Sequence, residues 1–553
     1  MDIIKFVTQI AGKKAWTPNM VSGLNLWLDA SDLSGSDGDV VSSWVSKEGN
    51  NYNFAQADEA KQPLLKKAAN GIGGHNIVRF DGSNDLLVLP SAPFIGVSGT
   101  AFIVYRLSAT PSTHQHLFSS CDEATTSHQA RLEGYYGPYM ASQFKTTGID
   151  NAISGNSLVF PEVPYIGMWQ SNDTVYAFAL NGVAQEITAT AGEDAGTWFG
   201  DIGNRDNTVI GGLKRTTEAA FLKGDVAEIL LYDSALDVDD TALVEAYIRN
   251  KYALNSGTYS IVLFGGVGDG TTDCTNAFNN AIDAVSNLGG GTIYIPTGTY
   301  KIASNITWKS NVNLTGDGIG SSIIALYGTA SIIRAGSIGN ELSNCTFSDV
   351  EIDGTNQTTP GTTRKGFFFT YCQQIHYLRV SVHDTGATGF GNDFLVNCTF
   401  TDCVATGCGR LGAVENSGCS GFGIGTGKYL IENTILTNCT ATGNKRYGVF
   451  FEIQGADDYK SSGIQIIGGT FNENQWGVGD CGVDGLIVIG SEINSNLDHG
   501  VIVNGPSVHN IAGINGTIEN CEIAFNTNIG ISPVAPDTYT LTNNNVHDNG
   551  ALT

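Results

Sequence analysis

Charged residues are scarce in this chain, and basic residues are the scarcest of them. Only 15% of the 553 residues are charged, and 28 Lys and Arg stand against 54 Asp and Glu, a formal net charge of -26. Such a surface repels nucleic acid and anionic lipid, so no nucleic-acid partner is expected. It also disfavours a strongly anionic polymer as ligand unless basic residues cluster locally, although solubility alone explains the same charge.

Long apolar runs and paired cysteine motifs are missing as well. No apolar run approaches the roughly 18 residues that span a bilayer, so no membrane insertion is expected. The 11 cysteines form no CxxC pair, which disfavours zinc and thioredoxin-like redox sites. Residues 1–16 do not fit a signal peptide, because Lys5, Thr8 and Gln9 interrupt the apolar stretch. Their spacing predicts a short amphipathic helix within residues 1–20 that anchors the chain, with a frayed leader as the alternative.

Glycine is the residue in excess, with 70 of 553 positions, and Asn, Thr, Ser and Ile recur throughout. This composition favours short strands and tight turns over helices. The length exceeds what one hydrophobic core supports. We therefore expect an all-β chain with a first domain at residues 21–254, a polar linker at 255–258 and a second domain at 259–553.

The first domain has the short, regularly spaced strand signals of a β-sandwich. We expect strands at 24–28, 77–80, 86–89, 102–105, 175–180 and 226–232, and a helix at 237–252 capped by Asp237. The runs GLNLWLDASDLSG (23–35), VRFDGSNDLLVL (78–89) and GDVAEILLYDSAL (224–236) resemble concanavalin-A-like, laminin-G-type domains. The resemblance implies a jelly-roll sandwich that often binds carbohydrate and sometimes calcium.

A calcium site in this domain is one of two interpretations of the segment DGSND at 81–85. Asp81, Asn84 and Asp85 carry the oxygen ligands that calcium prefers. The alternative is that they are turn residues of a hairpin between two strands. No other cofactor is expected.

After the linker the pattern of predicted helices, strands and glycine turns changes. GDG (268–270), a helix from Thr272 or Asp273 to Leu288, and the strands within GGGTIYIPTGTY (289–300) and NVNLTGDG (311–318) follow in order. This order resembles the start of the pectate-lyase superfamily, whose members include polysaccharide lyases, polygalacturonases, mannuronan epimerases and phage tailspikes. The resemblance implies a right-handed parallel β-helix whose N-terminal end is capped by the helix.

An internal repeat then takes over, which is typical of a solenoid. A Gly followed by an apolar residue recurs at positions 389, 421, 448, 477, 500 and 530. A second column of inward-facing residues runs through Val382, Ala405, Ala441, Phe471, Ile493, Ile523 and Val546. Cysteines beside this column should be buried and reduced, and stacked Asn should bond along the ladder. The rung at 549–553 shows no cap, so self-association is one expected cover for the open edge.

Because the interior of such a coil is packed, a site should lie on its outer face. Counting from the repeated Gly places Asp393 and Glu452 on one face, two rungs apart, with only Gly423 and Gly425 between them. Rungs about 4.8 Å apart put the two stems about 10 Å apart, close to the roughly 6.5–9.5 Å carboxyl separation of inverting glycosidases. We predict a catalytic pair in which Glu452, beside Phe450, is the general acid and Asp393 stays ionised and activates water.

Substrate contacts are predicted around this pair, on a face that extends to Asn504. The candidates are Arg410, Glu415, Arg446, Tyr447, Trp476, Asp480 and His499. Tyr447, Trp476 and His499 each precede a repeated Gly, which predicts an aromatic ladder for sugar rings. In a lyase, Tyr447 with Lys445 or Arg446 would transfer a proton and neutralise a uronate.

The runs TGATGFGND (385–393) and KRYGVFF (445–451) resemble the active-face coils of mannuronan epimerases. That resemblance implies an aromatic residue before the Gly-Phe-Asp run and a His shortly after it. Here Thr388 stands in place of the aromatic residue and no His follows Asp393. The sequence therefore departs from the epimerase pattern at the positions where the chemistry is expected.

Three functions stay open at the level of sequence. The first is a homotrimeric phage tailspike or receptor-binding protein in the virion, joined to tail proteins through its N-terminus, that recognises and cleaves a bacterial surface polysaccharide. The second is an extracellular bacterial polysaccharide lyase, epimerase or hydrolase that uses the sandwich as a carbohydrate-binding module. The third is an adhesin that binds carbohydrate without cleaving it.

Overall fold

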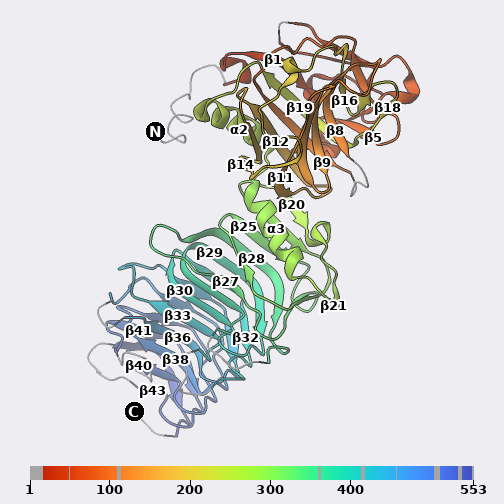
Figure 1. Ribbon diagram of the computed structural model, residues 1–553. Helices are drawn as coiled ribbons and strands as arrows, with labels where there is room; N and C mark the ends of the chain where they lie inside the picture. The colour runs from red at the N-terminus through yellow and green to blue at the C-terminus, as the bar shows by residue number, and fades with distance from the viewer. Residues whose placement is uncertain are drawn as a thin grey trace. The chain divides into compact units, whose positions relative to one another are not determined.

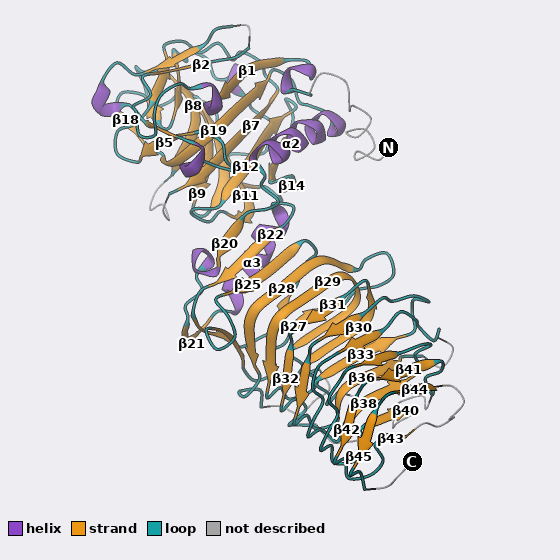
Figure 2. Ribbon diagram, turned by 180° about the vertical axis from the view of Figure 1, so that it is seen from behind, coloured by secondary structure: helices purple, strands orange, loops and turns teal. Residues whose placement is uncertain are grey.

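The computed structural model describes residues 16–550, apart from residues 49, 109–113, 359–362, 413–417, 456–457, 504–510 and 533–538. The expected helix at residues 1–20 lies almost wholly outside the described residues. The chain divides into two compact units, Met1–Gly257 with Asn287–Gly289, and Thr258–Ser286 with Gly290–Thr553 (Figure 1). Strands account for 47% of the structure and helices for 9%, so the expected all-β class is confirmed in this broad sense (Figure 2).

Unit 1 is built from two antiparallel sheets. The first has the strand order β14-β13-β12-β7-β19-β5-β4 with β1 beside β19, and the second has the order β15-β11-β10-β9-β8-β16-β6-β3-β2. The strands of the first sheet are β1 (Leu24–Asp29), β4 (Leu64–Lys66), β5 (Ile77–Asp81), β7 (Gly99–Leu107), β12 (Pro164–Ser171), β13 (Tyr176–Leu180), β14 (Val183–Ala184) and β19 (Lys223–Tyr232). Those of the second are β2 (Ser43–Val45), β3 (Asn53–Ala55), β6 (Leu87–Leu89), β8 (Gln115–Cys121), β9 (Gln129–Tyr136), β10 (Tyr139–Lys145), β11 (Asp150–Leu158), β15 (Thr188–Ala191) and β16 (Asn207–Ile210). A short pair, β17 (Leu213–Lys214) and β18 (Glu218–Ala219), stands apart from both.

The two sheets pack face to face, and large aromatic side chains join them. Trp169 on β12 donates its indole N–H to the Ala141 carbonyl on β10 at 2.8 Å. Tyr105 on β7 donates its hydroxyl to the Gly134 carbonyl on β9 at 3.2 Å. Both side chains are buried, so each satisfies its one polar group across the core while its ring fills the space between the sheets.

The segment DGSND at 81–85 does not form the hairpin considered above. Strand β5 pairs with β19 and β4 in the first sheet, whereas β6 pairs with β16 and β3 in the second. The segment therefore carries the chain from one sheet to the other. The six strands expected from sequence are present, but β8 to β11 were not predicted, because runs such as QARLEGYY mix charged and apolar residues on a face that the fold covers.

The two long helices begin at acidic caps. Helix α2 (Val238–Tyr252) starts after Asp237, whose carboxylate accepts from the Asp240 N–H at 2.9 Å, as predicted. Helix α3 (Thr275–Asn287) starts slightly later than expected, and Asp273 accepts from the Thr275 N–H at 3.0 Å. The predicted apolar face of α3 is buried: Ala277, Phe278, Ala281, Ile282 and Val285.

Unit 2 is a coil of parallel strands in which each strand pairs with the one or two that lie a full turn further along the chain (Figures 1 and 2). Its first part contains β20 (Thr258–Ser260), β21 (Asp269–Asp273), β22 (Gly291–Ile295), β23 (Gly298–Ile302), β24 (Ile306–Thr307), β25 (Val312–Gly316), β26 (Ser322–Leu326), β27 (Ile332–Arg334), β28 (Leu342–Asp353) and β29 (Phe367–His383). The later rungs contain β30 (Phe390–Val396), β31 (Thr399–Thr401), β32 (Val404–Thr406), β33 (Phe422–Thr426), β34 (Ile435–Thr437), β35 (Thr440–Thr442), β36 (Tyr447–Ile453), β37 (Gln465–Ile467), β38 (Trp476–Cys481), β39 (Ile487–Ile489), β40 (Val501–Val503), β41 (Gly516–Glu519), β42 (Glu522–Ala524), β43 (Ile531–Ser532), β44 (Tyr539–Thr542) and β45 (Asn545–His547).

The repeated Gly-apolar step predicted from sequence sets the register of this coil. The apolar residues that follow each Gly pair directly with one another from rung to rung: Phe390, Phe422, Val449, Val478, Val501 and Ile531. In the second column Val382 pairs with Ala405 and Ala405 with Ala441. All 11 cysteines are buried and free, which confirms the expectation of reduced thiols.

A buried ladder of asparagines holds the turn before each repeated Gly. The Asn444 amide donates to Asn474 Oδ1 at 2.9 Å, and the same bond recurs from Asn474 to Asn496 at 3.4 Å, from Asn496 to Asn526 at 2.8 Å and from Asn526 to Asn549 at 2.9 Å. Each acceptor oxygen also receives a backbone N–H from the preceding rung, at 3.0 Å in every case. The predicted Asn stacking is thus confirmed, and it leaves no amide group of the ladder without a partner along the coil.

The ladder explains why Gly recurs. A Cβ on Gly477 would lie 2.5 Å from the Gly500 carbonyl oxygen and 2.9 Å from the Asn496 amide nitrogen. The equivalent Cβ on Gly448 would lie 2.7 Å from the Gly477 carbonyl and 2.9 Å from the Asn474 amide. The backbone and the amide of the next rung therefore occupy the space that a side chain would need.

We expect Gly477→Ala to destabilise the coil by several kcal/mol, on the order of 3 or more, because neither the carbonyl nor the amide next to it can move without breaking a rung. Gly443→Ala is the matched control. Gly443 also lies in a turn of the coil, at φ 66°, but its added methyl would meet open space, so only the cost of a left-handed backbone, about 1 kcal/mol, applies. Urea denaturation of both variants measures the difference, and equal midpoints would contradict the packing argument.

Candidate functional site

Asp393 and Glu452 line the same pocket on the outer side of unit 2. The pocket has a volume of about 240 Å³, and its walls include Lys365, Phe368, Thr388, Phe450 and Gln454. Glu452 is buried, whereas Asp393 is partly exposed. The two carboxylates chosen from register alone thus meet in one cavity, although nothing in the geometry by itself assigns them a catalytic role.

The register of four successive rungs builds this pocket. One column contains Phe368, Gly391, Gly423 and Phe450 on strands β29, β30, β33 and β36. The adjacent position two residues on contains Thr370, Asp393, Gly425 and Glu452. A phenylalanine therefore stands at each end of a two-glycine gap, and the two carboxylates flank a third glycine. The predicted separation of Asp393 and Glu452 by two rungs is confirmed.

Neighbouring side chains fill part of the space above these glycines, and the rest is open. A side chain at Gly425 would collide with the Asp393 carboxylate, and the Gly425 N–H donates to Asp393 Oδ1 at 3.1 Å. A side chain at Gly391 would collide with the stem of Lys365. The glycines thus give Asp393 and Lys365 room to lie flat against the coil and point into the pocket.

Lys365 is the functional candidate that sequence reasoning missed. Its ammonium lies 4.1 Å from the centroid of the Phe368 ring and lines the pocket with Asp393 and Glu452. The sequence does contain a pattern that predicts the position of Lys365. Lys365-Gly366-Phe367 is one more Gly-apolar step of the repeat, since Phe367 pairs with Phe390. Lys365 therefore occupies the position before Gly that holds Thr388, Tyr447 and Trp476 in later rungs.

Burial moves the pKa values of Asp393 and Lys365 toward each other. It raises the pKa of Asp393 from its ordinary range, and only in part do the Lys365 charge and the Gly425 N–H oppose this. It lowers the pKa of Lys365, against the opposing charges of Asp393 and Glu452. Asp393 is thus harder to ionise than its glycine neighbours suggested, because a carboxyl that lines a pocket loses part of its hydration. Its role as the ionised base stays a prediction.

The predicted aromatic ladder is not exposed. Tyr447 and Trp476 are buried, and the Tyr447 ring stacks on Phe450 at 4.1 Å and on Trp476 at 4.9 Å between centroids. The Arg446 guanidinium is buried above the Tyr447 and Phe450 rings at 4.9 and 4.6 Å. With Cys481 and Ile502 these rings form one buried hydrophobic cluster. The prediction failed because Gly479 leaves a space that the Tyr447 ring fills, so that the aromatic residues pack on each other.

Asp480 is also buried, and its role is structural. It stands in the inward column of Phe451 and Val503, and its Oδ1 accepts from the Gly482 and Val483 N–H groups at 3.2 and 2.9 Å. Its other oxygen accepts from the Tyr539 hydroxyl. The prediction of substrate contact is therefore wrong for Asp480. His499 is partly exposed and pairs with Asp498 at 2.6 Å, whereas Glu415 and Asn504 lie outside the described residues.

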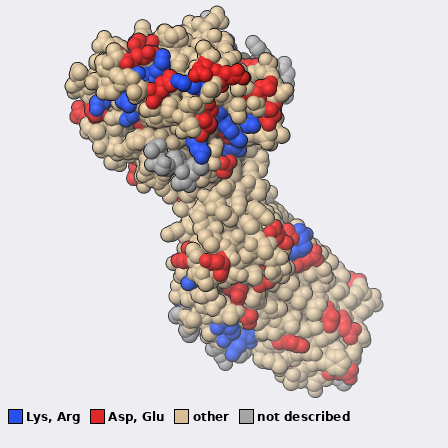
Figure 3. All heavy atoms as spheres, turned by 90° about the vertical axis from the view of Figure 1, so that its right-hand side faces the viewer, with Lys and Arg blue, Asp and Glu red and all other residues tan. Residues whose placement is uncertain are grey.

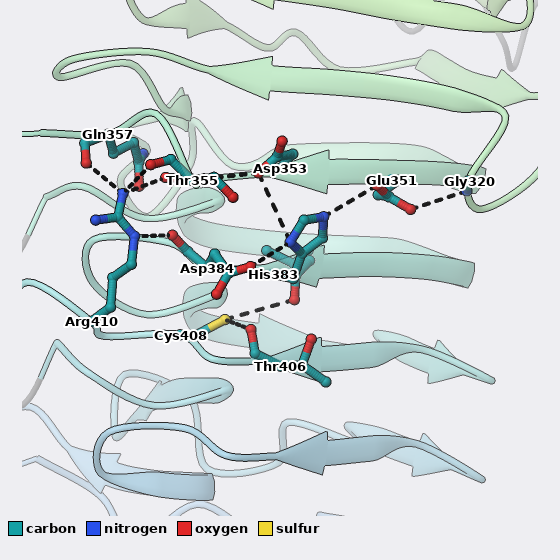
Figure 4. Close-up of polar contacts among 12 residues, drawn as sticks. Gly320, Glu351, Asp353, Thr355, Gln357, His383, Asp384, Thr406, Cys408 and Arg410 are labelled. Carbon is teal, nitrogen blue, oxygen red and sulfur yellow. Dashed lines mark hydrogen bonds and ion pairs between the residues drawn. The ribbon is translucent and has the colours of Figure 1, made fainter.

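Arg410 belongs to a polar network at the ends of β28 and β29 (Figure 4). Its guanidinium donates to the carbonyls of Asp384, Gly354 and Thr355 at 2.6, 2.8 and 2.7 Å. The guanidinium therefore ties two neighbouring turns together, and Arg410 does not line the pocket of Asp393. The structure thus places this predicted substrate contact in a supporting position.

His383 lies in the same network. It contacts Asp384 at 2.9 Å through Nδ1 and Glu351 at 3.2 Å through Nε2, with Asp353 nearby. Although burial opposes it, these acidic partners raise the pKa of His383.

The proposed calcium ligands Asp81 and Asp85 of unit 1 accept hydrogen bonds from backbone N–H groups of their own loop. Asp81 Oδ1 accepts from the N–H groups of Ser83 and Asn84 at 2.7 and 3.2 Å, and Asp85 accepts from the Asp81 N–H at 2.9 Å. Burial raises the pKa of Asp85 to about 6. These contacts match the turn interpretation, and calcium binding stays a prediction from sequence.

The charges visible on one side of the protein differ between the units (Figure 3). Acidic and basic side chains are interspersed over the visible face of unit 1. Much of the visible face of unit 2 carries neither, and its acidic and basic groups lie in separate patches. Among the described residues no helix is long and apolar enough to cross a bilayer.

Comparison with known proteins places this coil in a family. Residues 259–551 match the family described as rhamnogalacturonase A/epimerase, pectate lyase-like. Because the match covers more than half of the chain, the protein belongs to this pectate-lyase-like family. The predicted resemblance of the second domain is thereby confirmed at the level of the family.

Several curated relatives share part of the chain. The mannuronan C5-epimerase AlgE5 of Azotobacter vinelandii is 29% identical over 252 residues, which are 39% of this chain and 25% of the relative. Alginate lyase 7 of the same organism is 32% identical over 178 residues, 29% of this chain and 21% of the relative. The tail spike protein of Shigella phage Sf6 is 36% identical over 112 residues, 18% of each chain. This chain thus spans a quarter or less of these relatives.

Among solved structures, the A-module of the Azotobacter vinelandii mannuronan C-5 epimerase AlgE4 is similar with a TM-score of 0.40 and 21% identity, over 53% of this chain and 97% of that chain. The surface adhesin PfbA of Streptococcus pneumoniae is similar with a TM-score of 0.36 and 15% identity, over 53% of this chain and 81% of that one.

The buried carboxyl of Asp480 should make stability depend on pH. Burial raises its pKa from 3.8 to about 6, so the neutral form stabilises the fold at low pH, and this contribution is lost as pH rises from about 4 to about 6. We expect Asp480→Asn to remove that dependence and to raise the free energy of unfolding at pH 7–8 by up to about 3 kcal/mol, since the amide oxygen still accepts from both N–H groups.

The control is Asp402→Asn, an exposed aspartate at a strand end of the same coil. Urea denaturation from pH 4 to pH 8 should show the same pH profile for this control and for the unmodified chain. An Asp480→Asn profile that also parallels the unmodified chain would contradict the assignment.

Proposed function

We propose that this protein is a tailspike-type receptor-binding protein that binds and cleaves a bacterial surface polysaccharide. In this proposal unit 1 is a concanavalin-A-like domain that holds the polymer, and unit 2 is a right-handed parallel β-helix whose outer pocket cleaves it. The observation that carries the proposal is the pocket itself, where Asp393, Glu452 and Lys365 meet over glycine-cleared rungs. The named relatives support a polysaccharide as substrate, because they include epimerases, a lyase and a tail spike.

The pocket fits hydrolysis by a pair of carboxyl groups. The raised pKa of Asp393 favours Asp393 as the general acid that protonates the glycosidic oxygen while the C–O bond breaks. Glu452 then accepts a proton from the water that attacks the anomeric carbon. Stems two rungs, or about 10 Å, apart leave room for that water, which favours inversion. This assignment reverses the roles expected from sequence.

Lys365 and Phe368 complete the proposed subsite. The Phe368 ring forms part of the pocket wall and gives the apolar face of a sugar ring a surface to stack on. The ammonium of Lys365 supplies the local positive charge that an otherwise acidic chain needs to hold a sugar carboxylate. The substrate class that follows is a polysaccharide with acidic sugars.

A second candidate is elimination or epimerisation at a uronate. The similarity to mannuronan epimerases and an alginate lyase favours it, and so does the lowered pKa of Lys365. A lysine with a lowered pKa gives up its proton more readily, and its neutral amine can remove the proton beside the uronate carboxyl. The two candidates differ in their products, since hydrolysis yields new reducing ends alone and elimination yields unsaturated uronate as well.

We expect Asp393→Asn and Glu452→Gln each to lower the rate of cleavage by at least about a hundredfold, as loss of general acid–base catalysis does. Binding should be largely kept, because the amides nearly preserve shape. Reducing-end assays, ultraviolet absorbance of unsaturated uronate and a binding assay on the same capsular or lipopolysaccharide substrate measure the three quantities. Glu351→Gln, an acid of the His383 network, is the matched control and should cleave normally.

The outcomes separate the candidates. Loss of cleavage only in Lys365→Met, together with unsaturated products from the unmodified chain, would favour the lyase. Binding without new reducing ends, unsaturated uronate or epimerised uronate from the unmodified chain would favour an adhesin. Wild-type rates in both carboxylate variants would remove Asp393 and Glu452 from the mechanism.

The tailspike proposal also predicts a homotrimer that joins tail proteins through residues 1–20 and is located in the virion. Size-exclusion chromatography with light scattering on the full chain should give three times the mass of 58.3 kDa. A stable monomer at micromolar concentration would contradict the tailspike and favour a secreted enzyme with unit 1 as its binding module.

A further inference from the structure

Two histidines and a glutamate converge on the second sheet of unit 1, whereas the pocket proposed above belongs to unit 2. His114 precedes strand β8, His116 is its second residue, and Glu133 lies opposite on β9, in register with His116. Glu133 Oε2 lies 2.8 Å from His114 Nδ1 and 3.4 Å from His116 Nε2. One donor atom from each residue lies within 4.8 Å of the other two.

The surroundings of His116 indicate a missing ligand. Its side chain is fully buried, yet neither ring nitrogen has a hydrogen bond among the residues that the structure describes, and the 3.4 Å approach to Glu133 lacks hydrogen-bond geometry. Buried polar atoms are almost always paired, because an unpaired one loses hydration without compensation.

Glu133 supplies the negative charge of the cluster. Its carboxylate is buried, with 2% of the side chain exposed, and its Oε1 pairs with Arg131 Nε at 3.1 Å. Oε2 therefore faces the two histidines, while Oε1 is held in place by the ion pair with Arg131.

We propose that His114, His116 and Glu133 bind one divalent transition-metal ion of the zinc type. Two imidazole nitrogens and one carboxylate oxygen suit zinc, and they disfavour calcium and magnesium, which prefer oxygen ligands. Tetrahedral zinc with bonds of about 2.0–2.1 Å places neighbouring donors about 3.3 Å apart. The two separations from Glu133 Oε2, 2.8 and 3.4 Å, bracket this value, and the two histidine donors lie within 4.8 Å of each other. Binding would therefore need the histidines to approach by at most about 1.5 Å.

The fourth coordination position would open to a cavity. A pocket of about 240 Å³ is lined by His114 and Glu133, and its other walls include Arg131, Tyr136 and Gln143. His114 is the exposed edge of the cluster, with 43% of its side chain accessible, so an ion can enter from that side. A three-residue set with one open position leaves room for water, as in zinc sites that keep an exchangeable ligand.

The test uses the full chain, purified without a polyhistidine tag and treated with a chelator. Titration with Zn²⁺ by calorimetry, and metal analysis after gel filtration, should give one ion per chain. Co²⁺ should replace it and give the visible absorption of a tetrahedral or five-coordinate site. Bound Zn²⁺ should also raise the denaturation temperature.

His116→Ala and Glu133→Gln should abolish stoichiometric binding, and His114→Ala should weaken it at least tenfold. Since His114 is half exposed, its variant should fold even if the buried substitutions do not, which circular dichroism checks. The matched control is His128→Ala, a histidine just before β9 whose partner is Asp122 at 3.5 Å. This control should retain one ion per chain.

Two results would overturn the proposal. One is the absence of stoichiometric Zn²⁺ binding by the unmodified chain. The other is equal binding by folded His114→Ala and the unmodified chain, which would place the ion elsewhere. A cluster that is only an ion pair predicts the first result, together with a loss of stability in the variants that Zn²⁺ does not change.

Discussion

The structure of unit 2 depends on the side-chain amide ladder from Asn444 to Asn549. Each amide donates to the next rung and accepts a backbone N–H in return, so a shift of one residue in any rung would break two buried bonds at once. The same ladder occupies the space beside the repeated Gly residues from Gly421 to Gly530. The ladder thus fixes the register and the turns together, and it requires the glycines that make the sequence glycine-rich.

The pocket follows from that register. Outward positions are free to vary in a coil whose interior is fixed, and between Asp393 and Glu452 they are glycine. Where the same columns carry Phe450, Cys481 and Ile502, the outer face closes into a hydrophobic cluster. The outer face of one coil therefore holds an open polar pocket and a sealed apolar patch side by side, and small residues decide which of the two forms.

The dependence of the outer face on register and on small residues explains which features could be predicted from the sequence and which could not. The column of Phe390 and Val449, the Asn ladder and the two-rung separation of Asp393 and Glu452 follow from strand periodicity, which is local and regular. The burial of Tyr447 depends on the space that Gly479 leaves one rung further on, which the pattern around Gly448 alone does not show. The burial of Asp480 follows from its inward position three residues after Gly477, which was overlooked. Lys365 was missed for a different reason: the repeat was counted from Gly389, although Gly366 is one rung earlier. The connection that Asp81 to Asp85 make between the two sheets could not be predicted without knowing the strand order of each sheet.

The opposed pKa shifts of Asp393 and Lys365 give the pocket its chemical character. Two groups that share a partly enclosed pocket can exist as an ion pair or as a neutral acid and a neutral amine, and loss of water favours the neutral forms. A sugar that fills the pocket would expel further water and push both groups in that direction. An acid ready to give a proton and an amine ready to take one would then lie on either side of the same glycine-lined gap. The protonation states of Asp393 and Lys365 thus depend on how far the pocket walls exclude water, and the register of the coil sets the shape of those walls.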